Sequence, residues 1–243
     1  MKTTAGATRV WNYLKKRAVQ VSPGLHPRFQ GHQSTAPRKT GEFVVPVLGG
    51  VKIEVTLTNE AAVVDKWIRE RVVMSEKNTA IILGMDVEWR PNRWRGSNNR
   101  VALLQLATGS HCLLVQMLYL DTTPKLLGEC FSNPQVQLGG VGVVEDARKL
   151  ARDHGINCER QAIDLNLLAA KKMKQERVRT LGLKKLAEIV LGLPVAKNKR
   201  ITMSDWSRHC LGPDQVQYAA QDAWLGHAIL QKFHMPCPNI GCV

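Results

Sequence analysis

The sequence feature that most constrains the fold is a short apolar run that ends in two closely spaced acidic residues. Residues 81–83 (Ile-Ile-Leu) predict a buried strand that continues through Gly-Met into Asp86 and Glu88. Side chains two positions apart on a strand share a face, so the two carboxylates lie side by side. Burial and mutual repulsion both disfavour their ionised forms. A divalent cation with hard oxygen ligands, such as Mg²⁺ or Mn²⁺, removes that repulsion, and the pair therefore predicts a metal site.

Two later segments add acidic residues in suitable settings. Residues 139–150 read as a strand end, a glycine turn and a helix start, which places Asp146 in the first helical turn. Unpaired N–H groups favour an anion there, and Glu145 is the neighbouring rival as a ligand. In the last long helix, Tyr218 and Asp222 are four residues apart and share one face. A phenol one turn before a carboxylate can orient a water that a metal on the carboxylate activates.

These three motifs, in this order, resemble those of the DEDD superfamily of 3′–5′ exonucleases. The pattern is Asp-x-Glu after a strand, Gly-x-Gly-x-x-x-Asp before a helix, and Tyr-x-x-x-Asp in a late helix. The last motif marks the DEDDy branch, which includes ribonuclease D and polymerase proofreading domains. The sequence at 218–223 and the Ser-Asp-Trp at 204–206 resemble those of Werner-protein-like exonuclease domains, above all the stand-alone plant members. Some of those act on DNA and some on RNA, and the resemblance covers about residues 42–234.

The resemblance implies an α/β domain of the ribonuclease-H-like type, with a mixed β-sheet and helices on both faces. It also implies two Mg²⁺ or Mn²⁺ ions, about 3.5–4 Å apart, and hydrolysis that releases nucleoside 5′-monophosphates from the 3′ end of DNA or RNA. Tyr218 would orient the attacking water, where the DEDDh branch has a histidine general base. The metal ligands implied by the motifs are Asp86, Glu88, Asp146 and Asp222, and the catalytic set adds Tyr218.

Each of these residues also has an ordinary structural interpretation. The strand-end pair could be solvated, the helix-start acid could only complement the helix dipole, and the acid and tyrosine of the last helix could be a surface charge and a half-buried core residue. Asp164 is better explained as the N-cap of the helix that follows it. The alternative function is a non-catalytic nucleic-acid-binding or protein-interaction module on the same fold. A proofreading or helicase-associated role would need a separate partner chain.

Basic charge is segregated along the chain. The formal net charge is +14 over 243 residues. Residues 1–40 hold eight Lys/Arg and no acid, and residues 171–200 hold ten Lys/Arg against two acids, so the rest of the chain sums to 14 − 8 − 8 = −2. Segregated positive charge suits a nucleic-acid backbone, although such a run can also be a solvated face. We therefore expect nucleic acid as the partner, single-stranded or with an accessible 3′ end.

A smaller basic segment follows Glu88 directly and should border the site. Arginine binds phosphate in a fork geometry, and tryptophan offers a stacking face for a base. Otherwise the tryptophans are partly core and the arginines solvated. The candidate nucleic-acid-binding residues of this segment are Trp89, Arg90, Arg93, Trp94, Arg95 and Arg100.

Apolar and polar periodicity indicates one folded domain at 42–234, flanked by a basic arm at 1–40, expected to be disordered, and a short C-terminal tail at 235–243. The pattern predicts a hairpin, then a helix, then three antiparallel strands and a crossover. The expected strands lie at about 43–48, 51–57, 81–88, 101–107, 112–116 and 136–141, and the expected helices at about 59–75, 122–131, 144–154, 164–173, 181–191 and 214–233.

Composition also gives an expectation for the cellular location of the protein. No apolar run is long enough to cross a membrane, and the six cysteines form no Cys-x-x-Cys motif, so we expect reduced thiols in an intracellular protein of the nucleus or cytoplasm. The basic, acid-free N-terminus leaves an organelle transit peptide as an alternative. Some proteins that resemble this chain assemble into rings, so a homo-oligomer is also possible.

Overall fold

The computed structural model describes residues 40–72, 80–92, 94, 97–192, 194–195 and 199–235. The predictions for the basic arm, apart from Thr40, and for the C-terminal tail, apart from Met235, lie outside the described residues.

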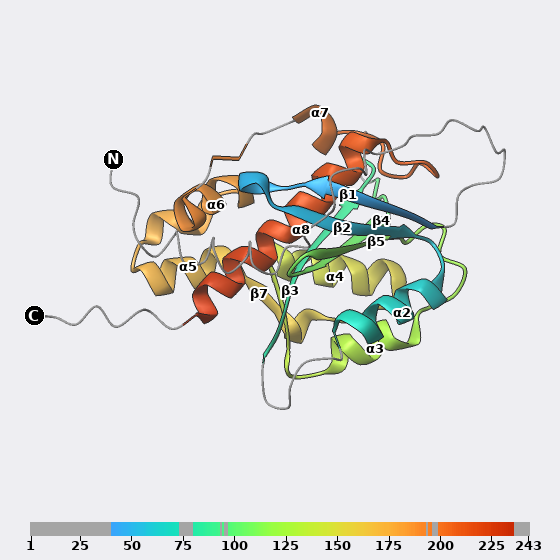
Figure 1. Cartoon of the computed structure of the whole chain (residues 1–243), viewed down its shortest axis with the longest axis horizontal. Helices are drawn as coiled ribbons and strands as arrows, with labels where there is room; N and C mark the ends of the chain where they lie inside the picture. Colours follow the sequence, from blue (N-terminus) through green and yellow to red (C-terminus); the bar gives the residue numbers. More distant parts are fainter. Residues whose placement is uncertain are drawn as a thin grey trace, which may run out of the picture.

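The described residues form a seven-stranded mixed sheet in the order β1-β2-β5-β4-β3-β6-β7 (Figure 1). Strands β3, β4 and β5 are antiparallel neighbours, and β1 and β2 form the predicted hairpin. Parallel pairings join β2 to β5, β3 to β6 and β6 to β7. The strands are β1 Thr40–Pro46, β2 Lys52–Thr58, β3 Ile81–Trp89, β4 Val101–Thr108, β5 His111–Gln116, β6 Val136–Gly140 and β7 Ala162–Asp164.

Helices cover both faces of this sheet, as predicted. The buried side chains of α5, α6 and α8 form one core with the sheet, and those of α2, α3 and α4 form a second core on the other face. The helices are α2 Ala61–Arg71, α3 Lys125–Ser132, α4 Val143–His154, α5 Leu165–Met173, α6 Leu183–Leu191, α7 Lys199–Thr202 and α8 Pro213–His234, with 3-10 turns η1 Leu48–Gly50, η2 Glu159–Gln161 and η3 Glu176–Thr180.

Most predicted elements are confirmed to within a few residues. Helix α2 is shorter than the predicted range and ends at Arg71, and residues 73–79 lie outside the described part of the chain. The short elements β7 and α7 were not predicted, because three or four residues carry too little periodicity to signal a strand or helix. Asp164 is confirmed as an N-cap, since its carboxylate accepts from the backbone N–H groups of Asn166 and Leu167.

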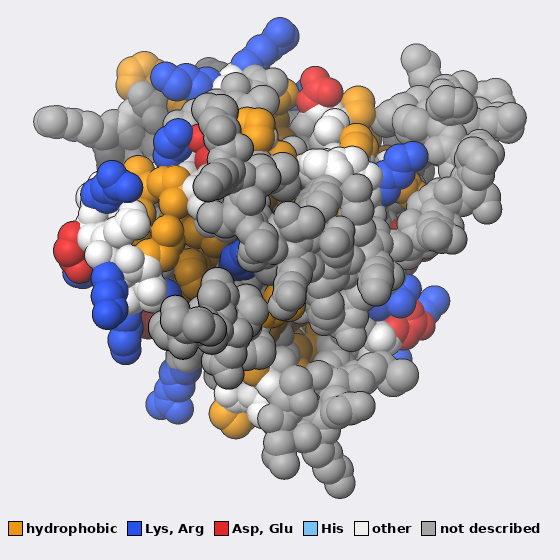
Figure 2. Space-filling model, turned by 60° about the vertical axis from the view of Figure 1, so that its left-hand side comes forward, with side chains coloured by type: hydrophobic (Ala, Val, Ile, Leu, Met, Phe, Trp, Pro, Cys, Tyr) orange, Lys and Arg blue, Asp and Glu red, His pale blue; other side chains and the backbone are white. Residues whose placement is uncertain are grey.

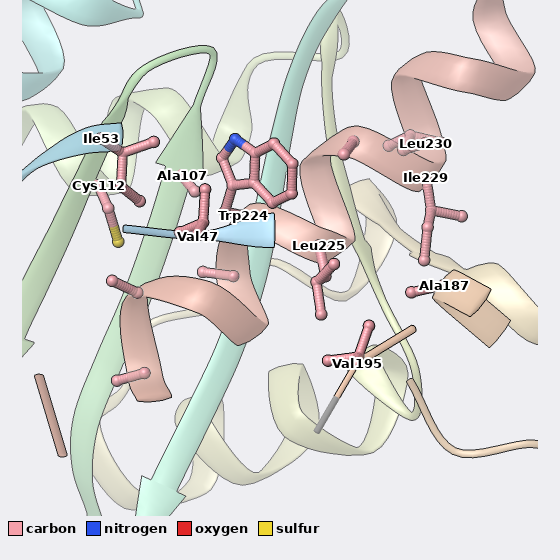
Figure 3. Close-up of a cluster of buried hydrophobic side chains, with 14 of the residues drawn as sticks. Val47, Ile53, Ala107, Cys112, Ala187, Val195, Trp224, Leu225, Ile229 and Leu230 are labelled. Atoms are coloured by element: carbon pink, nitrogen blue, oxygen red, sulfur yellow. The ribbon is translucent and has the colours of Figure 1, made fainter. Parts of the chain in front are cut away.

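Helix α8 packs across the face of the sheet that also carries α5 and α6 (Figure 3). Its apolar side chains contact strand residues on one side and α6 on the other, and each fully buried Leu or Ile contributes roughly 1.5–3 kcal/mol. The residues in this contact include Trp224, Leu225, Ile229 and Leu230 of α8, Val47, Ile53, Ala107 and Cys112 of the sheet side, and Ala187 of α6.

The closest contact in this layer is between backbones. A Cβ added at Gly84 of β3 would lie 1.8 Å from the carbonyl oxygen of Ala223 in α8. A Cβ added at Gly226 of α8 would lie 2.4 Å from the carbonyl oxygen of Gly139 in β6. Helix α8 therefore lies directly on the backbones of β3 and β6, with no side chain between them.

Two properties bear on the expectations from composition. Among the described residues, Cys112, Cys130, Cys158 and Cys210 are free. No helix in the described part of the chain is long and apolar enough to cross a membrane.

We predict that Gly84→Ala lowers the free energy of unfolding by about 1–3 kcal/mol or more, because the new methyl group would overlap the α8 backbone. The matched control is Gly128→Ala in α3, where an added Cβ meets nothing within 4 Å. There, alanine should stabilise the helix by up to about 1 kcal/mol. Urea unfolding followed by circular dichroism measures both, and equal effects of the two substitutions would contradict the close packing.

Candidate active site

Strand β3 presents two carboxylates to the α8 side of the sheet. Asp86 lies opposite Gln105 of β4, and Glu88 lies opposite Leu103, which belongs to the α8 core. Residues directly opposite on antiparallel strands share a face, so both acids point toward α8. The pairing register shifts between Glu88 and Trp89, and Trp89 is the last residue of β3 before the basic loop. The strand therefore ends its regular pairing at the second acid.

The glycine motif before α4 brings a third acid to the same place. A Cβ at Gly140 would lie 2.6 Å from the carbonyl oxygen of Met85, so only glycine fits against β3. Gly142 adopts a φ of 76°, which glycine tolerates, and the helix begins directly after it. Asp146 then lies half-buried in the first turn of α4, whereas Glu145 is exposed and pairs with Arg148 at 2.6 Å. The geometry favours Asp146 over its neighbour as the inward-facing acid.

Helix α8 supplies the fourth acid and the tyrosine. The residue Asp222 is 6% exposed, and Tyr218 is half-buried one turn before it. The hydroxyl of Thr202 in α7 donates to the phenolic oxygen of Tyr218 at 3.0 Å. Because that oxygen already accepts a hydrogen bond, the phenolic proton is left to donate elsewhere.

A lysine that the sequence analysis did not single out lies among these groups. The ammonium of Lys184, in the first turn of α6, is 3.7 Å from Oδ1 of Asp222 and 4.1 Å from the centre of the Tyr218 ring. Its side chain is only 11% exposed. In the sequence it was one cation of the 171–200 run, and no local spacing links it to α8. Its position beside Asp222 depends on the packing of α6 against α8.

Burial shifts the pKa values of all four acids upward. Burial raises the pKa of Asp86 well above its ordinary value, and the charges of the three other acids raise it further. Burial, then the charges of Asp222 and Asp146, raises the pKa of Glu88 to about 9. Burial raises the pKa of Asp146 to about 7, and it also raises that of Asp222 although Lys184 opposes the shift. The cluster therefore does not hold four negative charges at neutral pH without added positive charge.

The donor set fits a hard divalent cation. All four groups offer carboxylate oxygens, the ligands that Mg²⁺ and Mn²⁺ prefer. Oδ1 of Asp222 is buried, and within the described residues no hydrogen bond of ordinary length reaches it. As the side chains stand, no three His, Cys, Asp or Glu groups of the described chain converge closely enough to ligate one ion.

A second buried polar group borders Asp86. Gln105 is fully buried, and neither polar atom of its side chain has a hydrogen-bond partner among the described residues. It lies in β4 directly opposite Asp86. The strand pattern gave no signal for it, because a single glutamine in the apolar run of β4 does not change the strand assignment.

The basic loop after β3 is partly engaged in contacts with the fold. Trp89 is half-buried, with the ammonium of Lys149 5.1 Å from its ring centre, and Arg90 lies 3.8 Å from Asp205. The guanidinium of Arg100 donates to the backbone carbonyl of Asp153 at 2.6 Å.

The other loop candidates differ in exposure or lie outside the described chain. The side chain of Trp94 is 80% exposed. Arg93 and Arg95 lie outside the described residues.

Comparison with known families identifies the domain. The family described as "3'-5' exonuclease" matches residues 62–235, which include all four acids and the tyrosine. The chain belongs to the 3′–5′ exonuclease family. The resemblance inferred from the three motifs is confirmed at this level, and the narrower likeness to plant Werner-type members stays a prediction.

The relatives of this exonuclease domain are larger proteins. It is 35% identical to human "Exonuclease 3'-5' domain-containing protein 2" over 72% of this chain and 28% of that protein. It is 36% identical to the mouse "Bifunctional 3'-5' exonuclease/ATP-dependent helicase WRN" over 62% of this chain and 11% of that protein. The chain therefore spans about a quarter and a tenth of the lengths of these two relatives.

The fold of the exonuclease domain matches that of Escherichia coli RNase D, whose crystal structure is described as that of an exoribonuclease involved in structured RNA processing. The TM-score is 0.56 and the identity 22%, over 72% of this chain and 42% of that chain. At that identity the likeness establishes the fold alone. It confirms the predicted ribonuclease-H-like α/β class.

We predict that Lys184→Met destabilises the metal-free protein by about 1–3 kcal/mol, because buried carboxylates lose their nearest cation. Mg²⁺ should shrink the deficit by supplying positive charge. The matched control is Lys185→Met, since Lys185 is exposed and pairs with Glu188 at the surface, and its effect should stay within about 0.5 kcal/mol. Denaturant unfolding in EDTA and in Mg²⁺ measures the free energy of unfolding of each variant. Equal values for the two variants in EDTA would contradict the proposed electrostatic role of Lys184.

Proposed function

We propose that this protein is a metal-dependent 3′–5′ exonuclease that releases nucleoside 5′-monophosphates from the 3′ end of DNA or RNA. The observation that carries the proposal is the meeting of four acids from three separate elements. Asp86 and Glu88 come from β3, Asp146 from α4 and Asp222 from α8, and their charges act on one another. Acids that disfavour one another's ionised form make the folded state less stable. Such clusters are typical of catalytic sites. Family membership supports the same reaction.

The four carboxylates would hold two Mg²⁺ or Mn²⁺ ions, which supply an activated water and stabilise charge on the leaving 3′-oxygen. Tyr218 would orient the water. Burial raises the pKa of Tyr218, so its phenol stays protonated at neutral pH and donates a hydrogen bond rather than removing a proton. The hydrogen bond from Thr202 fixes the phenolic oxygen, and the ammonium of Lys184 lies against the ring. Both contacts hold Tyr218 in one orientation next to Asp222.

The loop after β3 is proposed to contact the substrate near the reacting end. Trp94 is exposed and offers a stacking surface for a base. Arg90 lies near Asp205 with almost half of its side chain exposed, so it can still reach a phosphate. The remaining loop candidates, Trp89, Arg93, Arg95 and Arg100, stay predictions, as do the homo-oligomer and the intracellular location in the nucleus or cytoplasm.

The function is tested with single strands of DNA and RNA labelled at either end and incubated with Mg²⁺, Mn²⁺ or EDTA. Stepwise shortening of the 5′-labelled strands, only with metal, is the expected result. Early release of the label from 3′-labelled strands gives the same polarity. Binding in EDTA without cleavage of either polymer in metal would instead support the non-catalytic module.

We predict that Asp86→Asn lowers turnover at least about 10³-fold, because it removes a carboxylate shared by the metal site. The metal-free variant should be as stable as the wild type or more stable, since one source of repulsion is gone. Glu145→Gln is the matched control: it removes an exposed acid one residue from Asp146 and should keep near-normal turnover. Mononucleotide release measured by chromatography tests both, and full activity of Asp86→Asn would rule out the site.

We predict that Tyr218→Phe slows turnover by about 10²-fold while Mn²⁺ binding is retained, because the phenol positions the water and is not a metal ligand. Single-turnover kinetics reports the chemical step, and calorimetric titration with Mn²⁺ reports metal affinity. An unchanged rate would make the tyrosine structural. A parallel loss of Mn²⁺ affinity would show that the ring supports the carboxylates instead of the water.

A further inference from the structure

The surface made by α5, η3 and α6 is strongly positive. Between residues 165 and 192 it carries seven Lys/Arg and two acids, a net charge of 7 − 2 = +5. Lys and Arg side chains stand out along the edge of the molecule on the side that carries α5 and α6 (Figure 2). The cations are Lys171, Lys172, Lys174, Arg177, Arg179, Lys184 and Lys185, and the acids are Glu176 and Glu188.

Part of this charge is not neutralised within the protein. Within the described chain, no acidic side chain pairs with Lys171, Lys172, Lys174 or Arg177, and all four are exposed. The other three cations are paired with acids. In the loop after β3, by contrast, the described arginines contact an acid or a backbone carbonyl. Helix α5 and η3 therefore carry four exposed cations that no acidic side chain of the described chain neutralises.

One end of this surface lies at the acid cluster. Helix α6 begins at the cluster, where Lys184 contacts Asp222 of α8. At the other end, α5 packs against α8, and the charge of Lys172 in α5 helps to lower the pKa of His234 in the last turn of α8. The distance along α8 from Asp222 to His234 is 234 − 222 = 12 residues, or about 18 Å at 1.5 Å per residue. A stacked strand covers that length in about five nucleotides at 3.4 Å each.

We propose that Lys171, Lys172, Lys174 and Arg177 bind phosphates of the substrate strand about three to five nucleotides on the 5′ side of the 3′ end held at the acid cluster. The proposal rests on the proposed function. Flexible lysines are point charges that bind the backbone without reading sequence. The surface should therefore raise affinity for long strands equally for all sequences, and it should not affect strands too short to reach it.

The test variant neutralises three of these cations: Lys171→Gln, Lys172→Gln and Lys174→Asn. Asparagine is chosen at Lys174 because that residue has a φ of 53° and asparagine tolerates this region. Binding of 12-nucleotide single strands is measured by fluorescence anisotropy in EDTA at several salt concentrations. The slope of log K against log salt should fall by roughly 2, since each lost phosphate contact on a single strand removes about 0.7.

The matched control removes the same number of cations from the opposite face of the sheet: Lys66→Gln, Arg69→Gln and Lys125→Gln on α2 and α3. These three residues are exposed and border the second core, away from α8. Their replacement gives the same change in net charge, and it should leave the salt slope and the 12-nucleotide affinity close to those of the wild type.

Turnover on strands of different length separates this proposal from the proposed function. With Mg²⁺, the triple variant should match the wild type on dinucleotides and trinucleotides, and its KM should rise about tenfold on 12-nucleotide strands. An unchanged salt slope, or an equal loss of turnover on short and long strands, would contradict the proposal that this surface binds the strand. The exonuclease assignment would stand in either case. If no strand is cleaved by the wild type, the proposed function fails, and the binding slopes in EDTA still decide whether this surface binds the backbone.

Discussion

The contact on which the candidate site depends is the direct packing of α8 against the backbones of β3 and β6. Gly84 and Gly226 bring backbone against backbone, and Gly139 leaves room for the side chain of Leu230. Because α8 lies so close, Asp222 reaches the face of β3 that carries Asp86 and Glu88. A larger residue at any of these glycines would move the helix outward and separate the carboxylates. The glycines are thus as much a part of the site as the acids that they bring together.

The acid cluster carries an electrostatic cost, and the fold offsets part of it. Burial raises the pKa values of all four carboxyl groups, and repulsion from the other acids of the cluster raises those of Asp86 and Glu88 further. Lys184 is placed against the most buried region of the cluster and opposes the shifts of Glu88 and Asp222. Positive charge from a divalent ion would offset the rest of this electrostatic cost.

Local patterns were enough to place the acids in their helices and strands but not to predict what surrounds them. Asp-x-Glu on a strand, Gly-x-Gly before a helix and Tyr-x-x-x-Asp on a helix each place their residues through short-range geometry, and each element formed where its pattern predicted. Lys184 and Gln105 reach the site only through packing between elements far apart in the sequence, which one chain without homologues does not reveal. The same applies to the parallel pairing of β2 with β5, which depends on long-range contacts rather than on a turn. The basic loop shows the limit of composition: its arginines were predicted to face substrate, and those described also hold the loop to the fold.

The contacts of two histidines bear on which branch of the superfamily the chemistry follows. His227 lies in α8 close to the site, and its Nε2 accepts a hydrogen bond from the backbone N–H of Gly109 at 3.0 Å. Its Nδ1 must then carry the proton that bonds to the carbonyl of Ile82 at 3.1 Å, so both ring nitrogens serve the packing of α8 on the sheet. His209 is stacked on Tyr119, with ring centres 3.6 Å apart. The contacts of His227 thus serve packing, whereas the hydroxyl of Tyr218 accepts a hydrogen bond from Thr202 one turn from Asp222, as the proposed orientation of a water by a neutral phenol would need.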